Sequence, residues 1–169
     1  MKIFEIMILE DEEGLFTKFS RGIPMKILKA NDFPVYRLEI DRSLVLIFYL
    51  FEIQKRPPAH LLENIFPSLK RIIWLSSQRQ FMNLTPPAEY NELFEQFEDL
   101  IPSAVILDVG DDSQTDLAEA LLHHGCYLGD QSRLYLWNAA DPQNSRQIWQ
   151  LIWSVHETPM EVATISEMP

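Results

Sequence analysis

Two short acidic segments are the parts of this sequence best able to do chemistry. Residues 10–13 (EDEE) follow one apolar run, and residues 108–112 (DVGDD) follow another. Hard cations such as Ca²⁺ take carboxylate oxygens as ligands, so the first segment could hold a divalent metal. Its spacing does not match the D-x-D-x-[DN]-G pattern of an EF-hand calcium loop, and a run of charges is usually a solvated turn. We therefore expect no bound metal and no cofactor at residues 10–13.

A second cluster of reactive residue types is His123-His124-Gly125-Cys126. A structural zinc site takes four ligands, usually from two separated pairs, and His60 and His156 form no second pair. We therefore expect the adjacent histidines to lie at a helix C-terminus, where the helix dipole favours them. His124 is close to Cys126 in sequence, but nothing supplies the oxyanion hole or the third member that nucleophilic catalysis needs. We interpret Cys126 as a half-buried apolar residue.

The chain that must position these residues is a strongly acidic protein of ordinary composition. It has 169 residues, 47% of them apolar, and its net charge is 14 − 25 = −11. Such a charge repels a phosphate backbone, which argues against a nucleic-acid partner. The longest apolar run, residues 44–51, is far shorter than the about 20 residues of a membrane span. We expect a cytoplasmic protein with no membrane partner.

Short apolar or alternating runs predict the β-strands. They cover residues 2–9, 35–40, 44–51, 71–75, 104–107 and 133–137. Residues 41–43 separate two of these runs and are short enough for a hairpin turn. Helical segments lie between the later strands, which is typical of a parallel sheet covered on both sides. The predicted fold class is therefore α/β: a three-layer, mostly parallel sheet with one antiparallel edge hairpin and helices on both faces.

Apolar side chains at helical spacing predict the helices. These cover residues 60–69, 85–100, 117–123 and 144–155. No internal repeat or linker divides the chain, so we expect a single domain over residues 1–157. Residues 158–169 show no periodicity and are expected to form a loose C-terminal tail.

Aromatic residues in two of these elements allow two interpretations each. Trp149 and Trp153 are spaced i and i+4, so both lie on one face of the last predicted helix. They either pack in the core or form an exposed contact for a protein partner, where tryptophan is enriched. Phe48, Tyr49 and Phe51 belong either to a covered central strand or to an edge strand that pairs with another chain.

Residues 10–17 (EDEEGLFT) stand directly after the first strand, where a phosphate-binding loop of the pattern G-x-x-x-x-G-K-[ST] would lie. Thr17 matches the magnesium-binding hydroxyl position of that pattern. Glu10 and Leu15 replace its two glycines, and Phe16 replaces its lysine; Gly14 is the loop's own glycine.

The later loops contain further remnants of nucleotide-binding motifs. After residues 104–107, Asp111 keeps the carboxylate of a guanine-reading N-K-x-D motif, whereas Asp108 replaces its asparagine. After the last strand, residues 138–140 (NAA) stand at the position of an S-A-K loop, and Ala139 matches its alanine. The D-x-x-G element is absent, with residues 51–54 (FEIQ) near its place.

The order of the strands and these motif positions resemble a small Ras-like GTPase. Residues 41–53 are also similar to the second-strand region of the bacterial cell-polarity GTPases of the gliding-motility (MglA-like) type. The resemblance implies a G-domain-like fold in which residues 15–22 form the helix after the phosphate loop. Since most motif residues are replaced, it also implies a pseudo-GTPase. Its degenerate nucleotide-site positions are Glu10, Gly14, Thr17, Asp108, Asp111 and Ala139.

The charge of the first loop leads to the same expectation without the resemblance. A phosphate loop works because small residues let backbone N–H groups approach the phosphate and a lysine adds positive charge. Residues 10–13 instead place carboxylates there, and each like-charge contact at about 4 Å costs on the order of 1–4 kcal/mol. We therefore expect nucleotide binding in the usual mode to fail.

Three functions remain as hypotheses. The first is a non-catalytic interaction scaffold or regulatory subunit, without catalytic residues, that binds a protein such as a GTPase or its regulator. The second is a small acidic inhibitor, for example an immunity protein that binds a basic toxin, because opposite charge speeds such encounters. The third is an enzyme that uses Asp108, Asp111 or Cys126.

Overall fold

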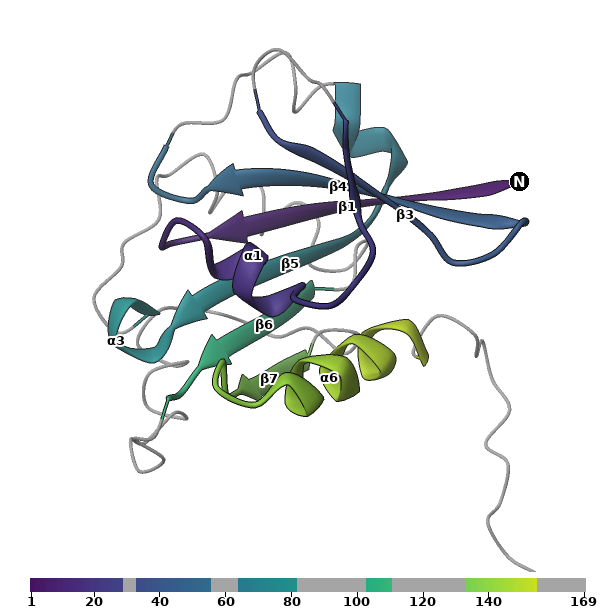
Figure 1. Cartoon of the computed structure of the whole chain (residues 1–169). Coiled ribbons are helices and arrows are strands. Elements are labelled where there is room, and N and C mark those ends of the chain that lie inside the picture. The colour runs from purple at the N-terminus through teal and green to yellow at the C-terminus, as the bar shows by residue number, and fades with distance from the viewer. Residues whose placement is uncertain (29–32, 56–63, 82–102, 111–132, 155–169) are drawn as a thin grey trace, which may run out of the picture.

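A single seven-stranded sheet organises the chain (Figure 1). The computed structural model describes residues 1–28, 33–55, 64–81, 103–110 and 133–154. The strands are β1 (Lys2–Glu10), β2 (Lys26–Leu28), β3 (Val35–Glu39), β4 (Leu44–Glu52), β5 (Leu69–Ser77), β6 (Ser103–Asp108) and β7 (Arg133–Trp137). Their order across the sheet is β2-β3-β4-β1-β5-β6-β7.

Most neighbouring strands in this sheet are parallel. β1 lies between β4 and β5 and is parallel to both, and β6 and β7 continue the parallel part. β3 is antiparallel to β4, which confirms the predicted hairpin. The hairpin is not the edge, however, because the unpredicted β2 adds a further antiparallel strand outside β3. All three residues of β2 are exposed, so its sequence shows no alternation of buried and exposed positions.

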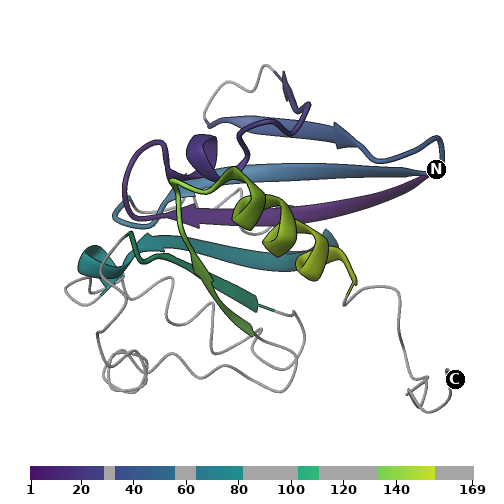
Figure 2. The same cartoon turned by 60° about the horizontal axis from the view of Figure 1, so that its bottom comes forward.

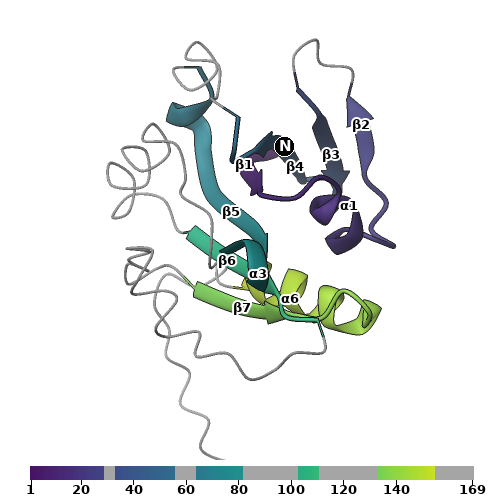
Figure 3. The same ribbon diagram turned by 90° about the vertical axis from the view of Figure 1, so that its left-hand side faces the viewer.

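Helices α1 (Leu15–Phe19) and α6 (Pro142–Ser154) cover the same face of the sheet (Figures 2 and 3). The expected helix over residues 15–22 is shorter than predicted. It ends at Phe19 with Ser20 as its C-cap, and Gly22 then adopts a φ of 83°, which favours glycine. α6 begins earlier than the expected residue 144 because the Asp141 carboxylate accepts the backbone N–H of Gln143 (2.9 Å).

The remaining described helices are short. Residues 64–68, which include the 3-10 helix η1 (Phe66–Ser68), lie within the expected helix over residues 60–69, and β5 begins at Leu69 instead of residue 71. Helix α3 (Gln78–Phe81) was not predicted, and Phe81 packs on the face opposite α1 and α6. Among the described helices, none is long and apolar enough to cross a membrane.

Buried side chains form one cluster on each face of the sheet. Along β1, Ile6 and Ile8 point toward α1 and α6, whereas Met7 and Leu9 point to the opposite face. A strand that is apolar on both sides is expected at the centre of a parallel sheet. β4 is central in the same way and Phe48 is fully buried, which agrees with the covered-strand interpretation of its aromatic residues.

Trp149 is a core residue. Its side chain is 3% exposed, stacks on Phe19 at 5.0 Å between ring centroids, and meets Phe48 edge-on at 5.6 Å. Its Nε1–H donates to the carbonyl oxygen of Phe19 (3.3 Å). The alternative of an exposed partner contact is therefore wrong for Trp149. Trp153 lies in α6, but its side chain is outside the described part of the chain.

Several expectations fall on residues outside the described ranges. They are the helices over residues 85–100 and 117–123, the tail over residues 158–169, and the side chains of Asp111, Asp112, His60, His123, His124, Cys126 and His156. These remain predictions from the sequence, as does the single domain over residues 1–157.

Candidate functional site

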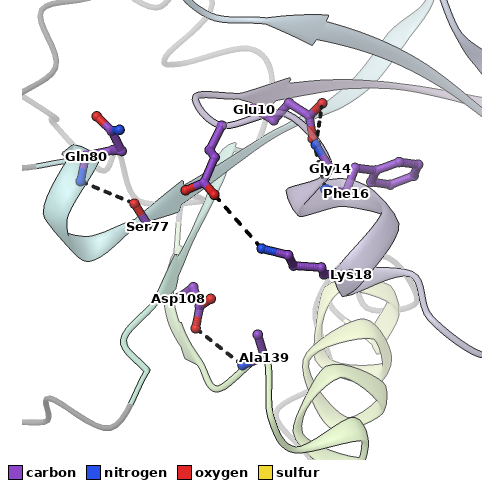
Figure 4. Close-up of polar contacts among 9 residues, drawn as sticks. Glu10, Gly14, Phe16, Lys18, Ser77, Gln80, Asp108 and Ala139 are labelled. Carbon is purple, nitrogen blue, oxygen red and sulfur yellow. Dashed lines mark hydrogen bonds and ion pairs between the residues drawn. The ribbon is translucent and has the colours of Figure 1, made fainter.

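The two acidic segments lie at the same edge of the sheet. Parallel strands release their following loops at a common edge, where α/β proteins usually bind ligands. Glu10 at the end of β1 lies beside Leu75 of β5, and Asp108 at the end of β6 lies beside Ser77 of β5 and Trp137 of β7. Figure 4 shows Glu10, Ser77 and Asp108 at this edge. The loops after β1, β6 and β7 thus have the relative placement that the resemblance requires.

The carboxylate of Glu10 is bound by its own loop. Its Oε2 accepts the backbone N–H of Phe16 (2.9 Å), and its Oε1 accepts that of Gly14 (3.4 Å) (Figure 4). Gly14 has a φ of 90°, a conformation that side-chain-bearing residues rarely adopt. The Glu10 side chain is 3% exposed, and burial raises its pKa, with further repulsion from Glu52 and Glu13.

This geometry corrects the expectation that residues 10–13 all project into a phosphate site. Glu10 and Asp11 are buried, and only Glu12 and Glu13 are exposed to solvent. Glu12 lies 4.0 Å from the ammonium group of Lys18, an exposed pair that contributes little to stability. Within the residues that the structure describes, no three His, Cys, Asp or Glu side chains are grouped to hold a metal ion.

Phe16, which stands at the lysine position of the motif, faces the core. Its ring is fully buried and meets Tyr36 edge-on at 5.0 Å, with Phe48 at 5.9 Å. A phosphate-loop lysine instead reaches toward the β- and γ-phosphates. Thr17, at the magnesium position, is exposed on α1. The loop therefore supplies no positive charge where the motif has its lysine.

Asp11 ties the same loop to β5 and to the end of β4. It is 6% exposed, and the hydroxyl of Ser76 donates to its Oδ2. Its backbone N–H donates to the carbonyl oxygen of Leu75 (3.3 Å), and its own carbonyl oxygen accepts from Nε2 of Gln54 (3.1 Å). Burial raises the pKa of Asp11 to about 6. Sequence reasoning missed this contact, because 65 residues separate Asp11 from Ser76.

Asp108 joins the loops that follow β6 and β7. Its Oδ1 accepts the backbone N–H of Gly110 (3.2 Å). The same oxygen accepts the backbone N–H of Ala139 (3.3 Å), which Figure 4 shows. Asn138 orders the second loop by accepting the N–H of Ala140 (2.9 Å) on its own Oδ1. Asp108 and Ala139 thus meet as positions of one site, whereas Asp111 lies outside the described residues.

Replacement of Asp108 by alanine is expected to lower the free energy of unfolding by about 1–2 kcal/mol, since two backbone N–H groups lose a charged acceptor. Asparagine keeps an acceptor oxygen, so Asp108→Asn should lose less than half of that amount. Urea denaturation of the two variants and the wild type measures the difference. Equal losses in both variants would show that the two hydrogen bonds are not the cause.

Comparisons with known proteins identify the fold of this chain but assign it to no family. No protein-family model matches this sequence, and no curated protein does. Among solved structures, the chain is similar to a variant of Era from Aquifex aeolicus bound to GDP·AlF4⁻, with a TM-score of 0.56 and 12% identity over 100% of this chain. Era in complex with MgGDPNP and a fragment of 16S ribosomal RNA gives a TM-score of 0.48 at 13% identity, also over 100% of this chain.

The chain spans 63% and 60% of the lengths of those two Era chains. At 12% identity, the first similarity shows the fold alone. It confirms the GTPase-like α/β fold that the order of strands and loops predicts. It does not support the narrower likeness to the cell-polarity GTPases.

Proposed function

We propose that this chain is a GTPase-like scaffold that binds no guanine nucleotide and acts by binding another protein. One observation carries the first part of this proposal: the Glu10 carboxylate accepts the backbone N–H groups of Gly14 and Phe16. In a phosphate loop, backbone N–H groups of this kind face the phosphates of the nucleotide. In this chain the Glu10 carboxylate already accepts both of these N–H groups.

The charges around the loop support the same conclusion. A bound phosphate would meet the carboxylate of Glu10, with Glu13 and Glu52 near enough to raise the pKa of Glu10 by repulsion. Phe16, which stands at the lysine position, carries no charge and is buried in the core, so it cannot offset these charges. Nucleotide binding would therefore require the loop to release Glu10 and to accept strong electrostatic repulsion.

Isothermal titration of the full chain with GDP and with GTP, each in the presence of Mg²⁺, tests this part of the proposal. We expect no binding heat above dilution up to millimolar nucleotide. A nucleotide-binding G-domain titrated in parallel confirms that the nucleotides are competent. A dissociation constant in the micromolar range or tighter for either nucleotide would refute the proposal.

Side chains that hold the described parts of these loops in place support the scaffold role. Glu10, Asp11 and Asp108 hold residues 10–16 and the described starts of the loops after β6 and β7, so the surface that these residues form does not need a nucleotide to take shape. A protein partner, such as a GTPase or its regulator, should therefore bind with the same affinity with and without added GDP or GTP. The cytoplasmic location and the alternative of an acidic inhibitor remain predictions from composition and net charge.

A further inference from the structure

Asp11 and Ser76 meet in the interior, where the single hydroxyl hydrogen of Ser76 faces two acceptors. The Ser76 hydroxyl lies within hydrogen-bond distance of two acceptors, Oδ2 of Asp11 and the backbone carbonyl oxygen of Ser77 (2.9 Å). A serine hydroxyl carries a single hydrogen, so it can donate to only one of them. When Asp11 is ionised, the other acceptor therefore receives nothing from Ser76.

A proton on Asp11 lets Ser76 form hydrogen bonds with both groups at once. The neutral carboxyl group donates from Oδ2 to Oγ of Ser76, and Ser76 then donates to the carbonyl oxygen of Ser77. The other oxygen of Asp11, Oδ1, is buried and has no hydrogen-bond partner in the described part of the chain. In the neutral acid it is a carbonyl oxygen, which costs less to bury unpaired than an oxygen of a carboxylate.

We propose that Asp11 is a proton-binding site and that its ionisation switches the hydrogen bonds that join the loop after β1 to the junction of β5 and α3. The hydrogen count at Ser76 is independent of nucleotide. This proton site is therefore separate from the proposed function.

The hydrogen bonds around Asp11 show how the change would spread. Asp11 contacts β5 through its backbone N–H on Leu75 and through Ser76. The next residue, Ser77, accepts the backbone N–H of Gln80 on its Oγ (3.3 Å) and so caps the first turn of α3. When Asp11 loses its proton, Ser76 turns its hydroxyl toward the carboxylate and releases the carbonyl oxygen of Ser77. The carbonyl oxygen that precedes α3 then loses its hydrogen bond from Ser76.

The charged groups around Asp11 favour the neutral form. Glu12 follows it in the loop, and its charge raises the pKa of Asp11 further. On the β4 side, Lys55 is engaged with Glu52 (2.6 Å), and on α3 Arg79 is exposed to solvent. Among the described residues, no ion pair joins Asp11 to a cation. Burial therefore outweighs the hydrogen bonds from Ser76 and the Ser77 backbone, which favour the carboxylate.

Nuclear magnetic resonance of the full chain between pH 4 and pH 8 tests the proposal. The carboxyl carbon of Asp11 should titrate with a midpoint near pH 6, well above the ordinary value of about 3.9. The backbone amide signals of Ser76, Ser77 and Gln78 should move with the same midpoint. A carboxyl midpoint below about pH 4.5, near the ordinary value, or amide signals that do not follow it, would overturn the proposal.

Two variants separate the proton on Asp11 from the general charge of the loop. Asp11→Asn cannot ionise, so the amide signals at residues 76–78 should keep their low-pH positions throughout the titration. Glu12→Gln removes the neighbouring exposed carboxylate and should keep the transition, with a midpoint slightly lower than in the wild type. If the amides of Asp11→Asn still titrate near pH 6, the proposal fails. If this variant does not fold, the carboxyl titration of the wild type decides alone.

The sign of the effect on stability follows from linkage. A pKa raised in the folded state means that the native protein binds the proton more tightly than the unfolded chain does. The contribution of Asp11 to stability is therefore fully present below about pH 4, the unfolded value, and is lost as the pH rises through about 6. The melting temperature of Asp11→Asn should exceed that of the wild type at pH 7.5, and the difference should shrink by pH 4.5.

Discussion

Replacing Trp149 with alanine is expected to lower the free energy of unfolding by about 4 kcal/mol, within the range for buried aromatic residues. The side chain is 3% exposed and fills the space between α6, α1 and β4 through its contacts with Phe19 and Phe48. Alanine would leave a cavity there and would remove the hydrogen bond from Nε1 to the carbonyl oxygen of Phe19. Urea denaturation at neutral pH measures the loss in the free energy of unfolding, with the same dependence on urea concentration (m-value) used for both proteins.

Leu151 provides the matched control on the same helix. Its side chain is 51% exposed, so Leu151→Ala should change the stability by about 0.5 kcal/mol or less. If Trp149→Ala were as mild as Leu151→Ala and instead weakened the binding of a protein partner, the exposed-contact interpretation of Trp149 would return.

Much of the sheet could be predicted because central strands such as β6 are buried on both faces, and because the edge strand β7 still consists mainly of apolar and aromatic residues. The runs at residues 104–107 and 133–137 predict β6 and β7 to within one residue at each end. β2 could not be predicted in the same way. It pairs on one side only, and its three residues are all exposed, so burial left no pattern in Lys26–Leu28. β2 forms because β3 provides a strand with which it can pair.

The site was predictable in its placement and not in its contacts. Strand order alone places Glu10 and Asp108 at one edge, because parallel strands end together. The direction of the Glu10 side chain depends on the backbone of its loop, where Gly14 turns with a φ of 90°. That glycine, directly after the acidic run at residues 10–13, was the available signal. The contact of Asp11 with Ser76 left no signal in the sequence, since these two distant segments meet only after the sheet has formed.

Glu10→Ala is expected to lower the free energy of unfolding by about 2 kcal/mol, because a buried N–H that loses a charged acceptor is costly. The N–H of Phe16 would lose its partner in the interior, whereas that of Gly14 is half-exposed and could turn to water. Glu13→Ala is the matched control, since Glu13 is exposed in the same loop and should change the stability by about 0.5 kcal/mol or less. Equal losses in the two variants would contradict the role of the two hydrogen bonds.

The same variant separates two reasons for the failure of nucleotide binding. If the Glu10 carboxylate were the only obstacle, its removal would free the N–H groups of Gly14 and Phe16 for a phosphate. We expect Glu10→Ala still to bind no GDP in the titration described above, because Phe16 is fully buried and leaves the loop without a lysine. Binding with a micromolar dissociation constant would contradict this expectation. It would show that one internal carboxylate alone keeps the loop closed to nucleotide.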